Sequence, residues 1–180
     1  MNRLAGSAVA ALLLLAMSAC GDSAIDATGT LASCASIRTI ASAEKAEPIE
    51  CLDGRAGVDV SRIKGPAIVN VWGSWCKPCK DELPIFKEFY AELDPSIQLI
   101  GVDVEEISAK AGRNFALEQG ITWPNLFDRE GETRSFFGMG VPVTWFIGED
   151  GKVVKKHIGV ITSIDHYVRQ LRRHLVDDDF

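Results

Sequence analysis

Apolar and polar positions along the chain predict strands and helices in alternation from about residue 49 onward. Two mostly apolar runs, at 66–72 and 97–104, have the length of strands that are buried on both faces of a sheet. Between them, apolar side chains recur every three or four residues, which predicts an amphipathic helix that Asp94-Pro95 ends. The apolar positions of this helix are Leu83, Phe86, Tyr90 and Leu93.

The second half of the chain continues the alternation and closes with a hairpin and a helix. The Asp150-Gly151 step marks a tight turn between two strands. This order of elements describes a three-layer α/β domain with a mixed central sheet. The remaining predicted elements are an alternating stretch at 58–60, a helix at 109–119, a brief strand at 125–127, a short helix at 131–137, strands at 143–147 and 152–158, and a helix at 161–176.

The first twenty residues have the pattern of an export signal. Arg3 precedes an apolar run from Leu4 to Met17, which is shorter than the ~20 residues that a membrane-spanning helix needs. A basic start, a short apolar core and a pair of small residues predict a secretory signal peptide over residues 1–19. The string MSAC resembles the bacterial lipobox, although Met17 stands where Leu is preferred. This resemblance implies that Cys20 is lipidated and anchors the protein to the cell membrane; the alternative is ordinary secretion with a free Cys20.

The stretch that follows has few large apolar side chains. Residues 20–47 are rich in Ala, Ser and Thr, and such a segment buries too little surface to offset the entropy of ordering it. We therefore interpret it as a flexible tether and place the folded domain at 48–180. Cys34 lies inside this segment, which is unusual for a linker.

Composition narrows the classes of function. The chain has 19 basic and 25 acidic residues and a net charge of −6, which argues against nucleic-acid binding because that binding depends on neutralising phosphates. The histidines, at 157, 166 and 174, do not have metal-ligand spacing. Glycine-rich phosphate loops and Ser/His/Asp arrangements are also missing from the sequence. We therefore expect neither a cofactor nor a metal.

A Cys-x-x-Cys pair, Cys76 and Cys79, lies where the first buried strand gives way to the first long helix. Such a pair either ligates zinc or carries dithiol redox chemistry. A structural zinc site needs four ligands, and the sequence has no second pair to complete it. The helix N-terminus favours a thiolate at Cys76, and a thiolate is the nucleophile of disulfide exchange. Cys79, one turn further, can then attack the mixed disulfide.

Two strings, NVWGSWCKPCKDELP at 70–84 and GVPVTWFI at 140–147, resemble the thioredoxin-fold thiol–disulfide oxidoreductases of the TlpA/ResA group. The resemblance covers about residues 49–176. It implies a thioredoxin-like fold with an N-terminal extension and a helix–strand insert at 105–127. It also implies that the redox-active disulfide joins Cys76, the attacking cysteine, to Cys79, the resolving one.

The same resemblance assigns roles to residues around the dithiol. Pro142 matches a proline held in the cis form, and the backbone at Val141 matches the part that pairs with substrate; the alternative is a trans proline in an ordinary turn. Trp75 is expected to shape the surface beside Cys76, unless it is merely packed. Pro84 matches a proline that kinks the active-site helix.

Glu82 is the candidate proton-transfer group. Thioredoxin has a buried aspartate in the strand before its cysteines, and the aligned residue here is Asn70, which cannot titrate. Glu82 lies three residues after Cys79 on the same helical face and matches a glutamate that the TlpA/ResA group places near its cysteines. A buried carboxylate there has a raised pKa and exchanges a proton with the Cys79 sulfur. The alternative is a solvated glutamate beside Lys80 and Asp81.

Cys34 and Cys51 remain after these assignments. A disulfide between them closes a loop worth ~3 kcal/mol outside the reducing cytosol and pins the tether to the domain edge. Two free thiols or intermolecular pairing are the alternatives. Trp123-Pro124, in the insert, is expected either in the substrate groove or in the core.

The sequence therefore favours a lipid-anchored, extracytoplasmic reductase of protein disulfides. The resemblance implies apocytochrome c as one such protein substrate and a membrane thiol transporter as the electron donor. An oxidase that introduces disulfides uses the same residues and is the main alternative. A thiol peroxidase requires Thr three residues before the attacking cysteine, where Gly73 stands, and a non-enzymatic binding module leaves the cysteines idle.

Overall fold

The computed structural model describes residues 31–43, 45, 47–138 and 140–176, without the side chains of 170 and 172–176. The predicted signal peptide and Cys20 lie outside the described residues. The elements of the described chain are β1 (Glu50–Cys51), β2 (Ala67–Trp72), α1 (Lys77–Ala91), β3 (Gln98–Val104), α2 (Ala109–Glu118), β4 (Asn125–Asp128), α3 (Arg134–Phe137), β5 (Val143–Ile147), β6 (Val153–Ile158) and α4 (Asp165–Val176), with short 3-10 helices η1 (Cys34–Ser36) and η2 (Val60–Arg62).

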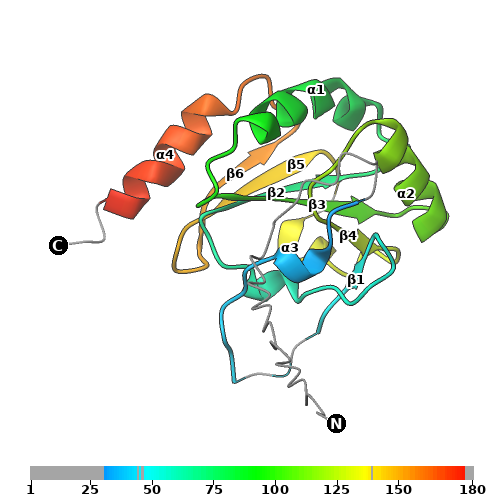
Figure 1. Ribbon diagram of the computed structural model, residues 1–180, viewed down its shortest axis with the longest axis horizontal. Coiled ribbons are helices and arrows are strands. Elements are labelled where there is room, and N and C mark those ends of the chain that lie inside the picture. The colour runs from blue at the N-terminus through cyan, green and yellow to red at the C-terminus, as the bar shows by residue number, and fades with distance from the viewer. Residues whose placement is uncertain (1–30, 44, 46, 139, 177–180) are drawn as a thin grey trace, which may run out of the picture.

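In the described part of the chain the strands form one sheet, in the order β1-β4-β3-β2-β5-β6 (Figure 1). β2, β3 and β4 are parallel, whereas β1, β5 and β6 run antiparallel to their neighbours. The predicted mixed sheet is thus confirmed. β2 and β3 are buried along their whole length, which explains why their sequences are apolar runs without alternation. β6 is an edge strand that carries Lys155 and Lys156, and charge on an edge opposes pairing with another chain.

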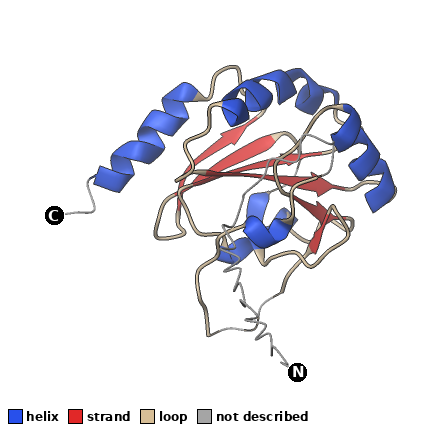
Figure 2. Cartoon of the chain, in the orientation of Figure 1, coloured by secondary structure: helices blue, strands red, loops and turns tan. Residues whose placement is uncertain are grey.

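Helices cover both faces of the sheet (Figure 2). Because successive side chains of a strand point to opposite faces, β2 contributes to two separate cores. Ile68 and Trp72 pack with α1, α2 and α4, whereas Val69 and Val71 pack with α3 and the N-terminal segment. The structure is the predicted three-layer, thioredoxin-like arrangement. None of the helices in the described ranges is both long enough and apolar enough to span a bilayer.

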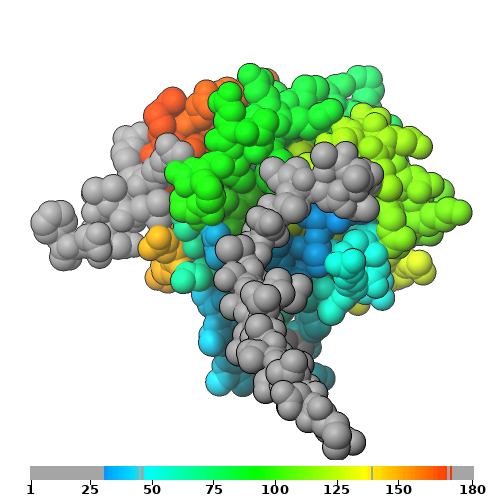
Figure 3. Space-filling view, in the orientation of Figure 1, coloured from blue at the N-terminus to red at the C-terminus, as the bar shows by residue number. Residues whose placement is uncertain are grey.

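The N-terminal part differs from the predicted tether. Cys34 and Ile37 are buried, Thr39 forms a bridge with Ile63, and the Arg38 N–H donates to Gln98 Oε1 at 2.6 Å. Figure 3 shows the start of this segment in blue against the rest of the molecule. The folded unit therefore begins before residue 48. Composition misses this because two buried side chains, Cys34 and Ile37, and the covalent link from Cys34 to Cys51 are enough to hold a short segment.

Three smaller features also differ from the sequence-based expectations. β1, which the sequence does not signal, pairs Cys51 with Leu126 of β4. The stretch at 58–60 is not a strand, because Asp59 caps η2 by accepting from the Ser61 N–H at 2.9 Å. The last helix begins at Asp165 rather than at 161.

Candidate active site

The two cysteines lie at the start of α1, directly after the loop that leaves β2. They form a disulfide with an S–S distance of 2.01 Å, and Cys76 is the residue that caps the helix. Pro78 stands in the first turn, where its missing N–H leaves no helical bond unmade. The chain therefore starts a helix at the Cys-x-x-Cys pair and places both sulfurs at its N-terminus.

The helix start polarises the Cys76 sulfur. The Cys79 N–H donates to Cys76 Sγ at 3.1 Å, and the unpaired N–H groups of the first turn carry partial positive charge. These groups stabilise a thiolate at Cys76 once the disulfide is reduced. The neighbouring Lys77 is directed elsewhere, since its Nζ pairs with Asp81 at 3.0 Å on the exposed side of the helix.

Glu82 lies on the buried face of α1, with no solvent exposure. Its Oε1 accepts from Asn70 Nδ2 at 2.8 Å, and its Oε2 accepts from the Ile161 N–H at 2.9 Å. Burial raises the pKa of Glu82 from an ordinary 4.5 to about 7, against the lowering effect of these two hydrogen bonds. The carboxyl is therefore not the solvated surface group of the alternative interpretation, and it exchanges protons near neutral pH.

Asn70 joins three elements around this carboxyl. Its Nδ2 also lies 3.2 Å from Thr144 Oγ1, so that β2, β5 and α1 share one buried polar cluster. Sequence reasoning identified Asn70 and Glu82 but missed Thr144 and Ile161. Ile161 offers no signal at all, because the group that binds Glu82 is a backbone N–H.

The Val141–Pro142 peptide bond is cis and directly precedes β5. Val143 of β5 pairs with Val71 of β2, so Pro142 lies beside the end of β2 from which the cysteine loop departs. Pro142 is buried and Val141 is partly exposed. The carbonyl of Pro142 accepts from the Gly159 N–H at 3.0 Å.

A hollow of about 220 Å³ opens between the two expected substrate contacts, Trp75 and Val141. Trp75 is 53% exposed, and its indole N–H donates to the Val104 carbonyl at 3.2 Å, which fixes the ring at the wall. Arg134 and Glu105, also on the wall, form an ion pair. The floor and sides are mostly apolar, formed by Val71, Val104, Phe137 and Val141 among others.

Trp123 does not contribute to this hollow. It is 2% exposed and packs in the core, with its ring 5.4 Å from that of Tyr90. Of the two expectations for Trp123, the structure supports the core position.

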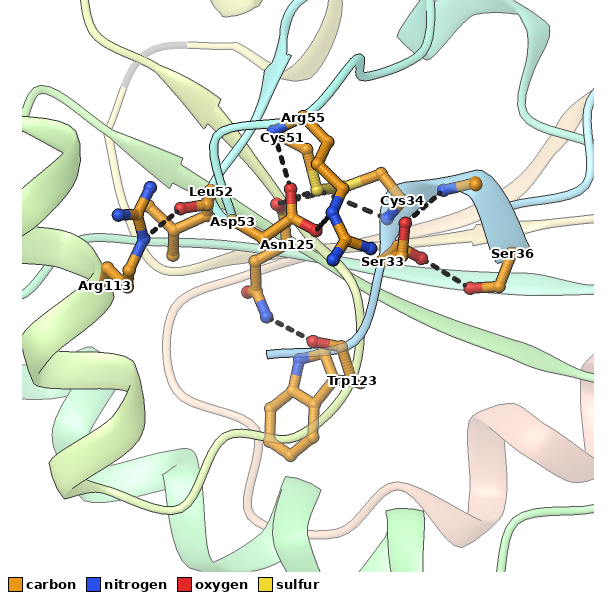
Figure 4. The surroundings of a disulfide bond; sticks show 11 residues. Ser33, Cys34, Ser36, Cys51, Leu52, Asp53, Arg55, Arg113, Trp123 and Asn125 are labelled. Atoms are coloured by element: carbon orange, nitrogen blue, oxygen red, sulfur yellow. Dashed lines mark hydrogen bonds and ion pairs between the residues drawn. A yellow bond between two sulfur atoms is a disulfide. The ribbon is translucent and has the colours of Figure 1, made fainter. Parts of the chain in front are cut away.

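The Cys34–Cys51 disulfide links the N-terminal segment to the sheet (Figure 4). Both residues are fully buried, and the Asn125 carbonyl of β4 accepts from the Leu52 N–H at 2.7 Å directly beside them. The side chain of Asn125 accepts from Trp72 Nε1 at 3.0 Å, at the end of the strand that leads to the active-site loop. The two cysteines are therefore joined in a disulfide, as predicted, and are not free thiols.

A second buried carboxyl, Asp103 in β3, was missed by sequence reasoning. Burial, and then the neighbouring Glu106, raise the pKa of Asp103 to about 9. Neither of its oxygens has a hydrogen-bond partner of ordinary geometry among the described residues. Glu106 itself accepts from the Ser74 N–H of the active-site loop. An acidic residue inside an apolar strand was the only available signal.

No group of three or more His, Cys, Asp or Glu side chains among the described residues is placed to hold a metal ion. His157 and His166 have different surroundings: His157 bonds to Val160 and Tyr167, whereas the ring of His166 meets that of Tyr167 edge to face. The side chain of His174 is outside the described part.

Residues 43–156 match the AhpC/TSA family. The thiol–disulfide oxidoreductase ResA of Bacillus thuringiensis (strain Al Hakam) is 30% identical over 125 residues, which are 67% of this chain and 71% of that protein. Among solved structures, StoA from Bacillus subtilis has a TM-score of 0.57 at 27% identity, covering 73% of this chain and 96% of StoA. DsbF of MTB has a TM-score of 0.61 at 25% identity, covering 71% of this chain and 94% of DsbF.

These similarities span the part of the chain that carries the dithiol, Glu82 and Pro142. The family match covers more than half of the sequence, and the relatives share the thioredoxin-like fold described above. The chain therefore belongs to the AhpC/TSA family and is a thiol–disulfide oxidoreductase of the ResA type.

Proposed function

We propose that this chain is a membrane-anchored, extracytoplasmic reductase of protein disulfides that acts through Cys76 and Cys79. The observation that carries the proposal is the buried Glu82, three residues beyond Cys79 on the same face of α1, with a pKa near 7. A base with that pKa is suited to remove a proton from the resolving thiol at neutral pH.

The reaction proceeds in two exchanges. The Cys76 thiolate attacks one sulfur of the substrate disulfide, a bond forms between them, and the other substrate sulfur leaves as a thiolate. Glu82 then accepts the Cys79 proton, the Cys79 thiolate attacks Cys76 Sγ, and the second substrate sulfur leaves. The first substrate thiolate takes a proton from water, to which Cys76 had released its own, and the second takes the proton that Glu82 accepted. The substrate thus gains two electrons and two protons, and the protein is left with the Cys76–Cys79 disulfide.

The substrate segment is proposed to lie across the hollow between Trp75 and Val141. Exposed indole surface and apolar walls suit a peptide whose side chains beside the cysteine are apolar. The backbone at Val141, next to the cis Pro142, is the proposed pairing site for an extended substrate strand. A cysteine pair in an unfolded protein, such as apocytochrome c, fits this description.

A thiol peroxidase is less well supported. A Cβ at Gly73 would lie 2.6 Å from Nε1 of Trp75, so the Thr that a peroxidase requires there does not fit beside the indole in its present place.

Anchoring and location rest on the sequence of the first twenty residues. A signal peptide over 1–19 followed by a lipidated Cys20 supports a position outside the cytoplasm, at the membrane surface. A membrane thiol transporter is then the proposed donor that reduces the Cys76–Cys79 disulfide again. Intact-mass measurement of the membrane fraction tests the anchor, and an unmodified, soluble mature protein contradicts it.

The direction of electron flow is tested by the equilibrium reduction potential of Cys76–Cys79, measured on an unlipidated chain from Gly21 with Cys34–Cys51 intact. A value near or below ~−270 mV supports the reductase, and a value near ~−120 mV identifies an oxidase instead. Cys79→Ser is expected to accumulate a mixed disulfide with substrate, and Cys76→Ser to form none. Mixed disulfides that form equally well in both variants contradict the assigned order of attack.

A further inference from the structure

The turn between β6 and α4 touches the active site at two backbone groups. The Gly159 N–H donates to the carbonyl of Pro142 at 3.0 Å, and the Ile161 N–H donates to Glu82 Oε2 at 2.9 Å. A backbone N–H cannot reorient by rotating a side chain. The hydrogen bond to Glu82 therefore depends on whatever holds the peptide units of this turn in place.

His157, at the end of β6, holds the turn from its other side. Its Nε2 lies 3.1 Å from the Val160 carbonyl oxygen, and its Nδ1 lies 2.9 Å from Tyr167 Oη. A carbonyl oxygen accepts only, so Nε2 is the donor to Val160, and Nδ1 is left to bond with the tyrosine hydroxyl, which can donate or accept. Tyr167 is itself fixed by stacking on Phe146, with ring centroids 4.8 Å apart.

The two bonds at this turn share one rigid unit. The Val160 C=O and the Ile161 N–H belong to the same planar peptide group. The donor on the oxygen side therefore sets the orientation of the N–H that faces Glu82. It also polarises the peptide, which makes that N–H a stronger donor, as in other chains of hydrogen bonds.

We propose that His157 is a positioning residue for the thiol–disulfide exchange, because it holds the Val160–Ile161 peptide with its N–H on the carboxylate of Glu82. This inference rests on the proton-transfer role proposed for Glu82. It gives a role to His157, which belongs neither to the cysteine pair nor to the cis-proline segment.

Among the described residues, the hydrogen-bond partners of Glu82 and His157 are neutral groups. Glu82 faces the neutral Asn70 and Thr144 cluster and the Ile161 N–H, and it lies three residues after Cys79 in α1. His157 faces Tyr167 of α4, and lies opposite Thr144 in the β5–β6 register. The charged and titratable groups nearest in sequence or by ring contact are Lys155, Lys156, with its Nζ over Trp145, and His166, whose ring meets Tyr167.

The test is the titration of the Glu82 carboxyl carbon by NMR, with carbon-13 in glutamate side chains of the mature chain in mild detergent. The protein is kept oxidised so that the thiols of the cysteine pair do not titrate. Glu82→Gln identifies the resonance by its loss. His157→Asn, which cannot reach the Val160 carbonyl, is expected to raise the Glu82 midpoint by about half a pH unit to one unit, the equivalent of one net hydrogen bond.

Matched variants separate positioning from general damage. His157→Gln keeps an N–H at the place of Nε2 and is expected to restore most of the wild-type midpoint. Tyr167→Phe keeps the stack on Phe146 but loses the hydroxyl, and is expected to give a smaller rise. His166→Asn, on the same helix and without a bond to the turn, is expected to leave the midpoint unchanged.

An unchanged Glu82 midpoint in both His157→Asn and Tyr167→Phe overturns the inference, as does an equal rise in His166→Asn. If His157→Asn does not fold, the comparison of His157→Gln with Tyr167→Phe still decides, since only the tyrosine variant is expected to move the midpoint. The proton-transfer role proposed for Glu82 fails separately, through a Glu82→Gln chain that exchanges disulfides at the wild-type rate at every pH.

Discussion

Replacing Glu82 by Gln is expected to change how the stability of the oxidised protein depends on pH. The buried carboxyl has a pKa of about 7 in the fold and an ordinary value of 4.5 in the unfolded chain. The folded state therefore binds a proton more tightly than the unfolded state, and stability falls as pH rises between these values. At 1.36 kcal/mol per pKa unit the difference is about 3 kcal/mol.

The sign follows from the raised pKa. The stabilising contribution of the protonated carboxyl is complete below about pH 4.5 and is lost as pH rises through 7. A Gln side chain stays neutral at every pH, so Glu82→Gln removes this loss. Gln also fits the site, because its oxygen accepts from the Ile161 N–H and its NH₂ donates to the Asn70 oxygen after that amide turns over.

The assay is urea unfolding of both oxidised proteins at intervals from pH 4 to pH 8.5. The two free energies of unfolding are expected to differ by a constant amount below pH 4.5, and the variant is expected to gain about 3 kcal/mol relative to wild type by pH 8. All other carboxyls contribute equally to both proteins and cancel in the difference. A difference that stays constant across the whole range refutes the reasoning.

Three further predictions concern other parts of the molecule. The free energy of unfolding of Asp103→Asn is expected to rise by more than about 2 kcal/mol relative to wild type between pH 4 and pH 9. The pKa of Asp103 is raised, so the wild-type protein loses the stabilising protonated form at high pH. Urea unfolding at pH 9 that shows no such gain contradicts this. Replacing Cys34 and Cys51 by Ala is expected to cost ~3 kcal/mol in thermal or urea unfolding and to speed amide exchange near η1, while the Cys76–Cys79 potential stays unchanged. Trp75→Ala is expected to cost about 1 kcal/mol of stability, because the half-exposed ring bonds to the Val104 carbonyl, but to lower kcat/KM for a protein disulfide about tenfold; a loss equally large with a small disulfide reagent argues against a substrate contact.

Much of the architecture follows from local pattern. β2 and β3 were predictable because a strand buried on both faces requires an unbroken apolar run, and α1 because its apolar side chains repeat at helical spacing. The dithiol was predictable for the same reason, since Cys76, Pro78 and Cys79 are neighbours in sequence and all act within one helical turn.

The features that the sequence did not reveal depend on partners far along the chain. β1 exists only because β4 offers an edge, and residues 31–43 are held by a cysteine and buried contacts from the next segment. The identity of Glu82 was visible in the sequence, but its environment was not, because Ile161 lies 79 residues away and binds through its backbone.

The sequence by itself thus determined most of the order of elements, from β2 onward, together with the fold class and the reactive pair. Only the tertiary structure decided the proton affinities of Glu82 and Asp103. The physical reason is that periodicity and helix-start chemistry act over a few residues, whereas desolvation is set by everything packed around a group. A carboxyl keeps an ordinary pKa until the fold removes water from it.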